Sequence, residues 1–165
     1  MGGKSLDLVS LSQLLAEKKA LTKTNLILIE QFKEKWGVST YDAIVETRLL
    51  TERELTDILA DYFRVTRLYT ISESEIFVGA FDEISFRDAR HYSVFPMGAD
   101  SGTGPIKLVL GDPTMKDTLE FISRSQRDYD FAVYEKSLVQ AAVIKYYPIS
   151  YQLPSLNSRG VNEEK

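Results

Sequence analysis

The sequence predicts an α+β fold, with a helical N-terminal subdomain of two tandem helix-turn-helix units followed by a small α/β subdomain with a short mixed sheet. Three observations predict it. A helical pattern occurs twice within residues 10–62, and the hydrophobic period changes after residue 63. Predicted helices then alternate with predicted strands as far as residue 147. We expect a flexible N-terminus at 1–9, the helical subdomain at 10–64, the α/β subdomain at 65–147 and a linker or tail at 148–165.

The composition of the chain narrows the classes of protein to which it can belong. Its 165 residues are 44% hydrophobic, which is enough for a folded core, and the net charge is −4. No excess of basic residues supports nucleic-acid binding, and no apolar run is long enough for direct membrane insertion. Because cysteine is absent, disulfides, thiolate metal sites and a cysteine nucleophile are excluded, and we expect a cytoplasmic protein.

The repeat pairs Ser10 with Ser39, an offset of 29 residues, and each copy predicts two short helices. Hydroxyl side chains are placed to cap them, namely Ser10 or Ser12, Thr22, Ser39 and Thr51. Thr51 with Glu54 is a full capping box, and Gly37 ends the second helix. The side chains expected to face inward are Leu11, Leu14, Leu15, Leu26, Ile29, Phe32, Ala43, Ile44, Val45, Leu55, Ile58, Leu59 and Tyr62.

Shorter elements are predicted after residue 63. We expect strands at 65–69, 92–97, 106–110 and 130–134, with a glycine-rich hairpin turn at 98–104, and leave 76–84 unassigned. Ser85 caps a helix that ends near His91, and Thr114 with Asp117 caps the next. We expect a last helix at 136–147. Its inward-facing side chains would be Leu138, Val139, Ala142, Val143 and Tyr146.

No set of side chains has the spacing of a catalytic centre, so we predict no enzyme activity, no cofactor and no metal. The glycines of 98–104 are not followed by the lysine and helix that a phosphate loop needs. His91 is the single histidine, and a capping or partly buried role is favoured over a general base. Asp112, Asp117 and Glu120 could gather a hard cation, but capping and solvent roles account for each of them.

Four aromatic side chains lie at the ends of the repeat units, and they allow two interpretations. They could stack on a base or anchor a partner, or they could seal the junction between the units. We favour sealing. The four are Trp36, Tyr41, Tyr62 and Phe63.

The two units, followed by ARHYSVFP at 89–96, KLVLGDP at 107–113 and the helix that covers 139–147, resemble the N-terminal domain of the ATPases of type II secretion and type IV pilus assembly, also called MshEN. The resemblance covers about residues 10–147. It implies a regulatory part of a motor. Some members of this family bind cyclic di-GMP through two tandem motifs that open with Arg-Leu-Gly, have a second glycine at the tenth place and close with glutamine.

This sequence keeps the apolar skeleton of those motifs but loses their polar and glycine positions. The apolar positions are Leu11, Leu15, Leu21 and Leu26 in the first copy and Ile44, Val45, Leu50 and Leu55 in the second. Arginine is replaced by Ser10 and Ser39, the first glycine by Ser12 and Tyr41, the second by Lys19 and Arg48, and glutamine by Lys33 and Tyr62. Glycine lets the backbone approach a flat ligand, and arginine makes bidentate bonds that serine cannot make.

We therefore predict a non-catalytic regulatory or adaptor module, with a degenerate cyclic di-GMP motif, that mediates protein–protein interaction in a bacterial secretion, type IV pilus or related signalling system. Its partner, a motor ATPase or another component of such a system, would bind around Lys19, Tyr41, Arg48 and Tyr62. The alternative is a cyclic di-GMP sensor with altered contacts. Its ligand-binding residues would be Leu11, Leu15, Lys19, Leu21, Ile44, Arg48 and Leu50.

Overall fold

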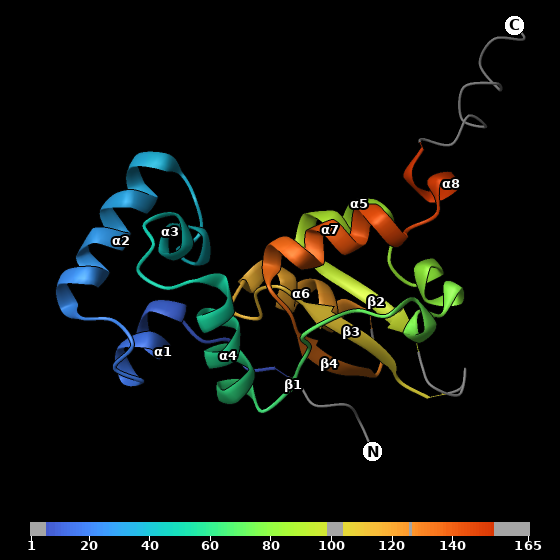
Figure 1. Cartoon of the computed structure of the whole chain (residues 1–165), viewed down its shortest axis with the longest axis horizontal. Helices are drawn as coiled ribbons and strands as arrows, with labels where there is room; N and C mark the ends of the chain where they lie inside the picture. Colours follow the sequence, from blue (N-terminus) through green and yellow to red (C-terminus); the bar gives the residue numbers. More distant parts are fainter. Residues whose placement is uncertain (1–5, 99–103, 126, 154–165) are drawn as a thin grey trace, which may run out of the picture.

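Four helices form the first half of the molecule, α1 (Leu11–Glu17), α2 (Lys23–Trp36), α3 (Thr40–Glu46) and α4 (Glu52–Phe63). The computed structural model describes residues 6–98, 104–125 and 127–153. The four helices gather at one end of the molecule and the sheet lies at the other (Figure 1). The two helix pairs predicted from the repeat are confirmed.

Each of these helices begins at a hydroxyl residue whose side chain accepts a hydrogen bond from the first turn. The bonds run from Gln13 N to Ser10, Asn25 N to Thr22, Asp42 N to Ser39 and Glu54 N to Thr51. Reciprocal capping boxes form at Thr22 and Thr51, whereas the cap at Ser39 is one-sided. Gly37 ends α2 with a φ of 65°, in the left-handed conformation that glycine adopts readily.

The second half contains a four-stranded mixed sheet, as the alternation of elements predicted. Its strands are β1 (Thr66–Arg67), β2 (Val94–Gly98), β3 (Ile106–Leu110) and β4 (Tyr129–Val133), in the order β1-β4-β3-β2. β2 and β3 form the expected antiparallel hairpin, and β3 runs parallel to β4. β1 pairs only with the end of β4, at Ala132 and Val133.

Several helices connect or cover these strands. They are η1 (Glu73–Glu75), η2 (Val78–Asp82), α5 (Phe86–Tyr92), α6 (Lys116–Arg124), α7 (Lys136–Tyr146) and α8 (Ile149–Gln152). α5 and α7 pack side by side against the sheet, and α6 is the crossover between β3 and β4 (Figure 1). α8 lies in the stretch expected to be a tail, where the Gln152 side chain donates to the carbonyls of Ile144 and Tyr147 at 3.0 and 2.8 Å.

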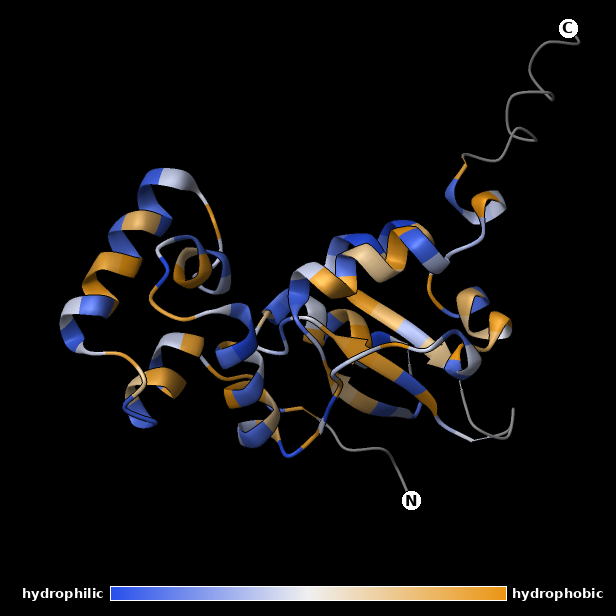
Figure 2. Ribbon diagram, in the orientation of Figure 1, coloured by the Kyte–Doolittle hydropathy of each residue, from blue (hydrophilic) through white to orange (hydrophobic). Residues whose placement is uncertain are grey.

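Two hydrophobic cores meet near the end of the sheet. One fills the space between α1, α2, α3 and α4, and the other lies between the sheet and the helices that cover it. Apolar residues recur along the strands and along each helix of the first half (Figure 2). Val133, the last residue of β4, belongs to the helical core, and Val65 contacts both cores. The sheet therefore contributes directly to the packing of the helical half.

Some local predictions were wrong. Thr114 does not cap α6, because its backbone N–H and hydroxyl both donate to Asp112, and α6 instead begins after Met115 without a side-chain cap. Leu138 and Tyr62 were expected inside but are 42% and 37% exposed. Three predicted segments lie partly outside the described residues, namely the N-terminus 1–9, the turn 98–104 and the tail 148–165.

Candidate functional site

The two loops that join the helices of each pair have the same backbone conformation. Lys19 and Arg48, which occupy the second glycine position of the motif, have φ angles of 56° and 58°. The residue after each donates its backbone N–H back into the preceding helix, Ala20 to Leu15 O at 2.9 Å and Leu49 to Ile44 O at 3.2 Å. Both loops thus have the left-handed turn that glycine adopts without strain, although a long cationic side chain stands there. Both cationic side chains are exposed.

The apolar residues proposed as ligand contacts lie in the helical core. Leu11, Leu15, Leu21 and Ile44 are at most 7% exposed, and Leu50 is partly buried against them. Of the seven residues predicted to contact the ligand, Lys19 and Arg48 are the two whose side chains are exposed.

Tyr41 was predicted to lie on a partner-binding surface, and this is wrong because its side chain is 1% exposed. Its hydroxyl accepts from Lys136 N at 3.3 Å and donates to Glu52 Oε1 at 3.4 Å. The ammonium of Lys136 lies 5.3 Å from the centre of the ring. Burial raises the pKa of Tyr41 above its usual range, so the hydroxyl stays protonated. Tyr41 seals the junction between the helical half and α7.

The structure brings together only some of the other predicted partner residues. An ion pair between Lys18 Nζ and Asp61 Oδ2, 3.3 Å apart, places the first loop beside the C-terminal end of α4, where Tyr62 is exposed. Arg48 precedes the N-cap of the same helix, at its opposite end. The 12 residues of α4 separate the two ends by roughly 18 Å. Lys19 and Tyr62 can share one surface, but Arg48 lies apart from them.

Three exposed apolar side chains on α2 were missed. Ile27, Leu28 and Trp36 are 59%, 45% and 61% exposed, so Trp36 does not seal the units as expected. Its ring centre lies 6.2 Å from that of Phe32, which is partly buried. The sequence carried a signal, because LILI at 26–29 places four apolar residues in one turn and a helix cannot turn all four inward.

A second missed feature is the polar junction at the start of α7. The Glu52 carboxylate accepts from Ser137 N at 3.0 Å and from Ser137 Oγ at 2.5 Å, and Lys136 Nζ lies 2.9 Å from Asp42 Oδ1. Gly111 packs closely against the backbone of Lys136, because a Cβ atom at position 111 would lie 2.9 Å from Lys136 Cα. Parallel strands in open α/β sheets usually bind ligands at their carboxyl ends. Here side chains of α3 and α4 occupy that position.

Asp112 lies in this junction as a buried turn residue. It is 3% exposed and accepts from Thr114 N at 3.0 Å and Thr114 Oγ1 at 2.5 Å. Burial raises its pKa more than these bonds and the charge of Lys136 lower it. Within the described ranges no group of three or more His, Cys, Asp or Glu side chains could hold a metal ion.

Arg67 joins the two halves on the other side of β1. Its guanidinium lies 2.8 Å from Asp57 Oδ1 on α4 and 2.7 Å from Glu135 Oε1 before α7. Burial raises the pKa of Glu135, but the hydrogen bonds and the charge of Arg67, together with a bond from the backbone N–H of Glu135 itself, outweigh burial and lower the pKa below its usual value. The side chains of Arg67 and Glu135 are only 9% and 14% exposed, so this pair is shielded from solvent.

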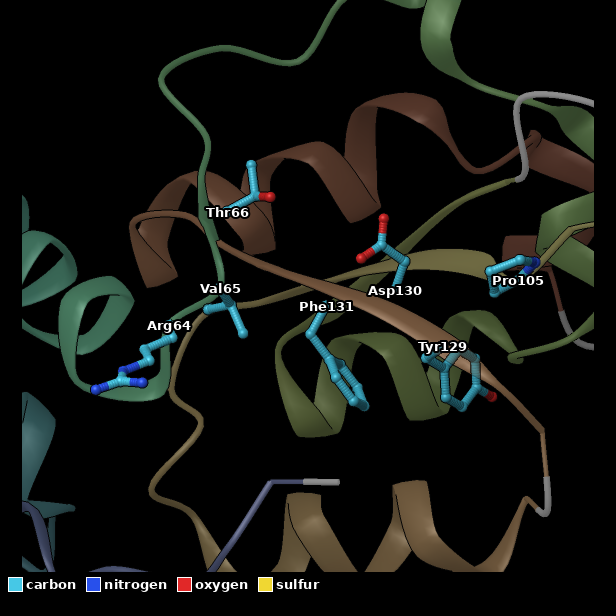
Figure 3. Close-up of a pocket in the computed structure, with 7 residues that line it drawn as sticks. All are labelled: Arg64, Val65, Thr66, Pro105, Tyr129, Asp130 and Phe131. Carbon is cyan, nitrogen blue, oxygen red and sulfur yellow. The ribbon is translucent and has the colours of Figure 1, made fainter. Parts of the chain in front are cut away.

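A cavity of about 220 Å³ lies where β1 leaves part of β4 uncovered (Figure 3). The chain leaving α4 forms one wall at 64–66, β4 forms the other at 129–131, and Pro105 closes one end. Figure 3 shows Tyr129 and Phe131 on one side of β4 and Asp130 on the other. None of the site residues predicted from the sequence lines this cavity.

His91 is exposed on the last turn of α5, and this differs from the capping or partly buried role that the sequence favoured. Its ring packs edge-on against Tyr92, with the centres 4.7 Å apart.

Among the helices in the described part of the chain, none has the length and apolar character required to cross a bilayer.

Comparison with known proteins gives solved structures of the same fold. A structure of MshE with cyclic di-GMP matches 84% of this chain and 99% of its own length, with a TM-score of 0.67 and 16% identity. The N-terminal domain of XpsE matches 90% of this chain and all of its own length, with a TM-score of 0.60 and 16% identity. A second crystal form of that domain has a TM-score of 0.53.

No protein-family model matches the sequence, and no curated protein does either. These structures confirm the fold expected from the resemblance, because the chain matches each of them over most of its length. The chain has the fold of the N-terminal domain of XpsE and of MshE.

Proposed function

We propose that this chain is a non-catalytic regulatory or adaptor module, which mediates protein–protein interaction in a bacterial secretion, type IV pilus or related signalling system. The observation that carries the proposal is the fold shared with the XpsE and MshE domains over 84 to 90% of the chain. In the family that the sequence resembles, this fold is an appendage of a motor ATPase. The lack of cysteine in all 165 residues fits a cytoplasmic site of action.

The exposed side of α2 around Leu28 is the surface that best fits a protein partner. Large apolar side chains are exposed to water here, namely Ile27, Leu28 and Trp36. Burying them against another protein would lower the free energy of the complex. Trp36 has a neighbouring cation, Lys35, 5.3 Å from its ring centre. Tryptophan is enriched among the few residues that contribute most of the binding energy of an interface. A second contact at Lys19 and Tyr62 would extend the interface towards α4.

A photo-crosslinking residue placed at Leu28 in the native host tests this function. We expect crosslinks to a motor ATPase or another secretion, pilus or signalling component. The matched control carries the same residue at Ser123, which is exposed on α6 in the other half of the molecule. Crosslinks to no such component from Leu28, or the same products from both positions, would contradict the proposal.

The variant Leu28→Glu gives a second readout of the same surface. Because the side chain is 45% exposed, the charge should leave the thermal midpoint nearly unchanged while it abolishes partner recovery. Unchanged recovery with this variant would show that α2 is not the interface.

A cyclic di-GMP sensor with altered contacts is the second candidate. The specific observation in its favour is the pair of left-handed turns at Lys19 and Arg48, which keep the loop shape of the motif and add two cations. Calorimetric titration with cyclic di-GMP decides between the candidates. Micromolar binding that is lost in Lys19→Glu/Arg48→Glu would support the sensor, and flat heats would exclude it.

A further inference from the structure

Three side chains on the outer face of α5 form a cluster to which no role has yet been assigned. Arg87, Arg90 and His91 are spaced i, i+3 and i+4, so they lie on one face of the helix. All three are exposed. The net charge of the chain is −4, so two guanidiniums and an imidazole together on one helix are not a consequence of overall composition.

The guanidiniums of this cluster have no partner among the residues that the structure describes. Among residues 6–98, 104–125 and 127–153, neither Arg87 nor Arg90 takes part in an ion pair or hydrogen bond, whereas Arg67 and Arg127 are each paired with glutamate. Asp88 lies on the same helix and does not pair with either guanidinium. Its charge instead adds to the burial that raises the pKa of Tyr147.

Helix stability explains only part of the cluster. Arg90 and His91 lie in the last turn of α5, where the helix dipole favours cations. Arg87 is the second residue of the helix, and the dipole disfavours a cation there. An unpaired cation in an unfavourable position is the kind of local conflict that functional sites retain.

The surface around the cluster is hollowed. Two adjoining hollows of about 310 and 420 Å³ both have Arg87 and His91 in their walls. Phe86 and Arg90 complete the first, and Ser85, Asp88 and Tyr92 complete the second. Tyr92 is held in place by stacking on Phe121, with ring centres 4.4 Å apart. Both hollows are open to solvent and are lined only by residues 85–92, so a small anion can enter them directly.

We propose that the α5 cluster is a binding site for a phosphate group, with Arg87, Arg90 and His91 donating N–H bonds to its oxygens. Guanidinium suits this ligand because its planar set of donors matches two phosphate oxygens at once, and charge-assisted bonds are the stronger ones. The site is separate from the exposed apolar residues of α2 and from the loops at Lys19 and Arg48, so it does not rest on the function proposed above.

Amide NMR titration of the full chain at constant ionic strength tests the site. The probes are inorganic phosphate, O-phosphoserine, guanosine monophosphate and cyclic di-GMP, with sodium chloride as the blank. We expect saturable shifts of residues 85–92 with at least one phosphate compound. The strongest binder identifies the source of the phosphate, whether free anion, phosphorylated side chain or nucleotide. No saturable shift of these residues with any of the four would overturn the proposal.

Two variants of equal charge separate a site from a general charge effect. Arg87→Gln/Arg90→Gln should weaken binding by about tenfold or more. Arg124→Gln/Lys145→Gln removes two exposed cations from α6 and α7 and should leave the affinity unchanged. Equal weakening by both pairs would reduce the effect to non-specific attraction and would contradict the proposal. Thermal unfolding of both variants checks that the fold is kept.

Discussion

The carboxylate of Glu52, the first residue of α4, caps the first turn of α7 through Ser137, whose backbone N–H and hydroxyl both donate to it. The residue before α7, Glu135, provides no side-chain cap of its own. The N–H groups at the start of a helix need acceptors, and a negative charge there is also favoured by the helix dipole. One side chain from the helical half thus completes a helix of the other half.

Replacement of Glu52 by alanine should lower the free energy of unfolding by about 1–2 kcal/mol, because two donors of α7 lose their acceptor. Glu52→Gln keeps one acceptor and should lose less. Urea unfolding followed by circular dichroism measures both. The matched control is Arg53→Ala, which removes the exposed neighbour on the same turn and should change stability by less than about 0.5 kcal/mol. Equal losses from Glu52→Ala and Arg53→Ala would argue against a capping role.

The pair of Arg67 with Glu135 should make stability depend on acid pH. The pKa of Glu135 is lowered in the folded protein, so its contribution is present above the ordinary value of 4.5 and is lost as pH falls through the lower folded value. Arg67→Gln should be less stable by about 2 kcal/mol at pH 7, with a gap that narrows below pH 4.5. Urea unfolding at several pH values measures the gap, and a gap that stays constant would contradict this assignment.

Asp112 should have the opposite effect, because burial raises its pKa. The folded protein holds this proton more tightly than the unfolded chain, so the carboxyl favours folding below its ordinary value of 3.8, and that contribution is lost as pH rises through the folded pKa. Asp112→Asn keeps an acceptor for Thr114 and should be more stable than the parent at pH 7, with an advantage that shrinks in acid. A less stable variant at pH 7 would mean that attraction to Lys136 outweighs burial.

The left-handed turn at Arg48 predicts that glycine is better tolerated there than a side chain. Arg48→Gly should raise the free energy of unfolding by up to about 1 kcal/mol, because it relieves backbone strain. Glu46, two residues earlier in α3, has ordinary helical geometry. Glu46→Gly should therefore lower the free energy of unfolding by about 1 kcal/mol. Thermal unfolding of the two variants gives the comparison, and two losses of similar size would show that Arg48 is unstrained.

Local signals predicted most of the fold. The caps at Thr22 and Thr51 were readable because both partners of each cap lie within four residues, and the hairpin of β2 and β3 was readable from two apolar runs around glycines. Thr114 was misassigned for a local reason as well, because Asp112 competes for its donors and a capping-box spacing does not reveal that competition.

The site was harder to predict because its contacts join distant parts of the chain. Sealing and partner binding both stayed open for Tyr41 because nothing near it in sequence decides between them, and the residue that contacts its buried hydroxyl is Lys136, 95 positions away. Glu52 was given no role from the sequence, although its carboxylate contacts a residue 85 positions later. The exposed apolar residues of α2 could have been found by counting, because four consecutive apolar residues exceed the inward face of one helix.

Because Val133 of the sheet belongs to the helical core, the chain cannot be cut between α4 and β1 without a loss to both halves. A fragment that stops after α4 leaves behind the strand residue that fills the helical core, and a fragment that begins at β1 leaves behind the acceptor for α7. Neither piece would keep all the contacts that its residues make in the whole chain. Expression of either half alone should therefore yield a poorly behaved product, and any domain exchange with another protein should transfer residues 6–153 as one block.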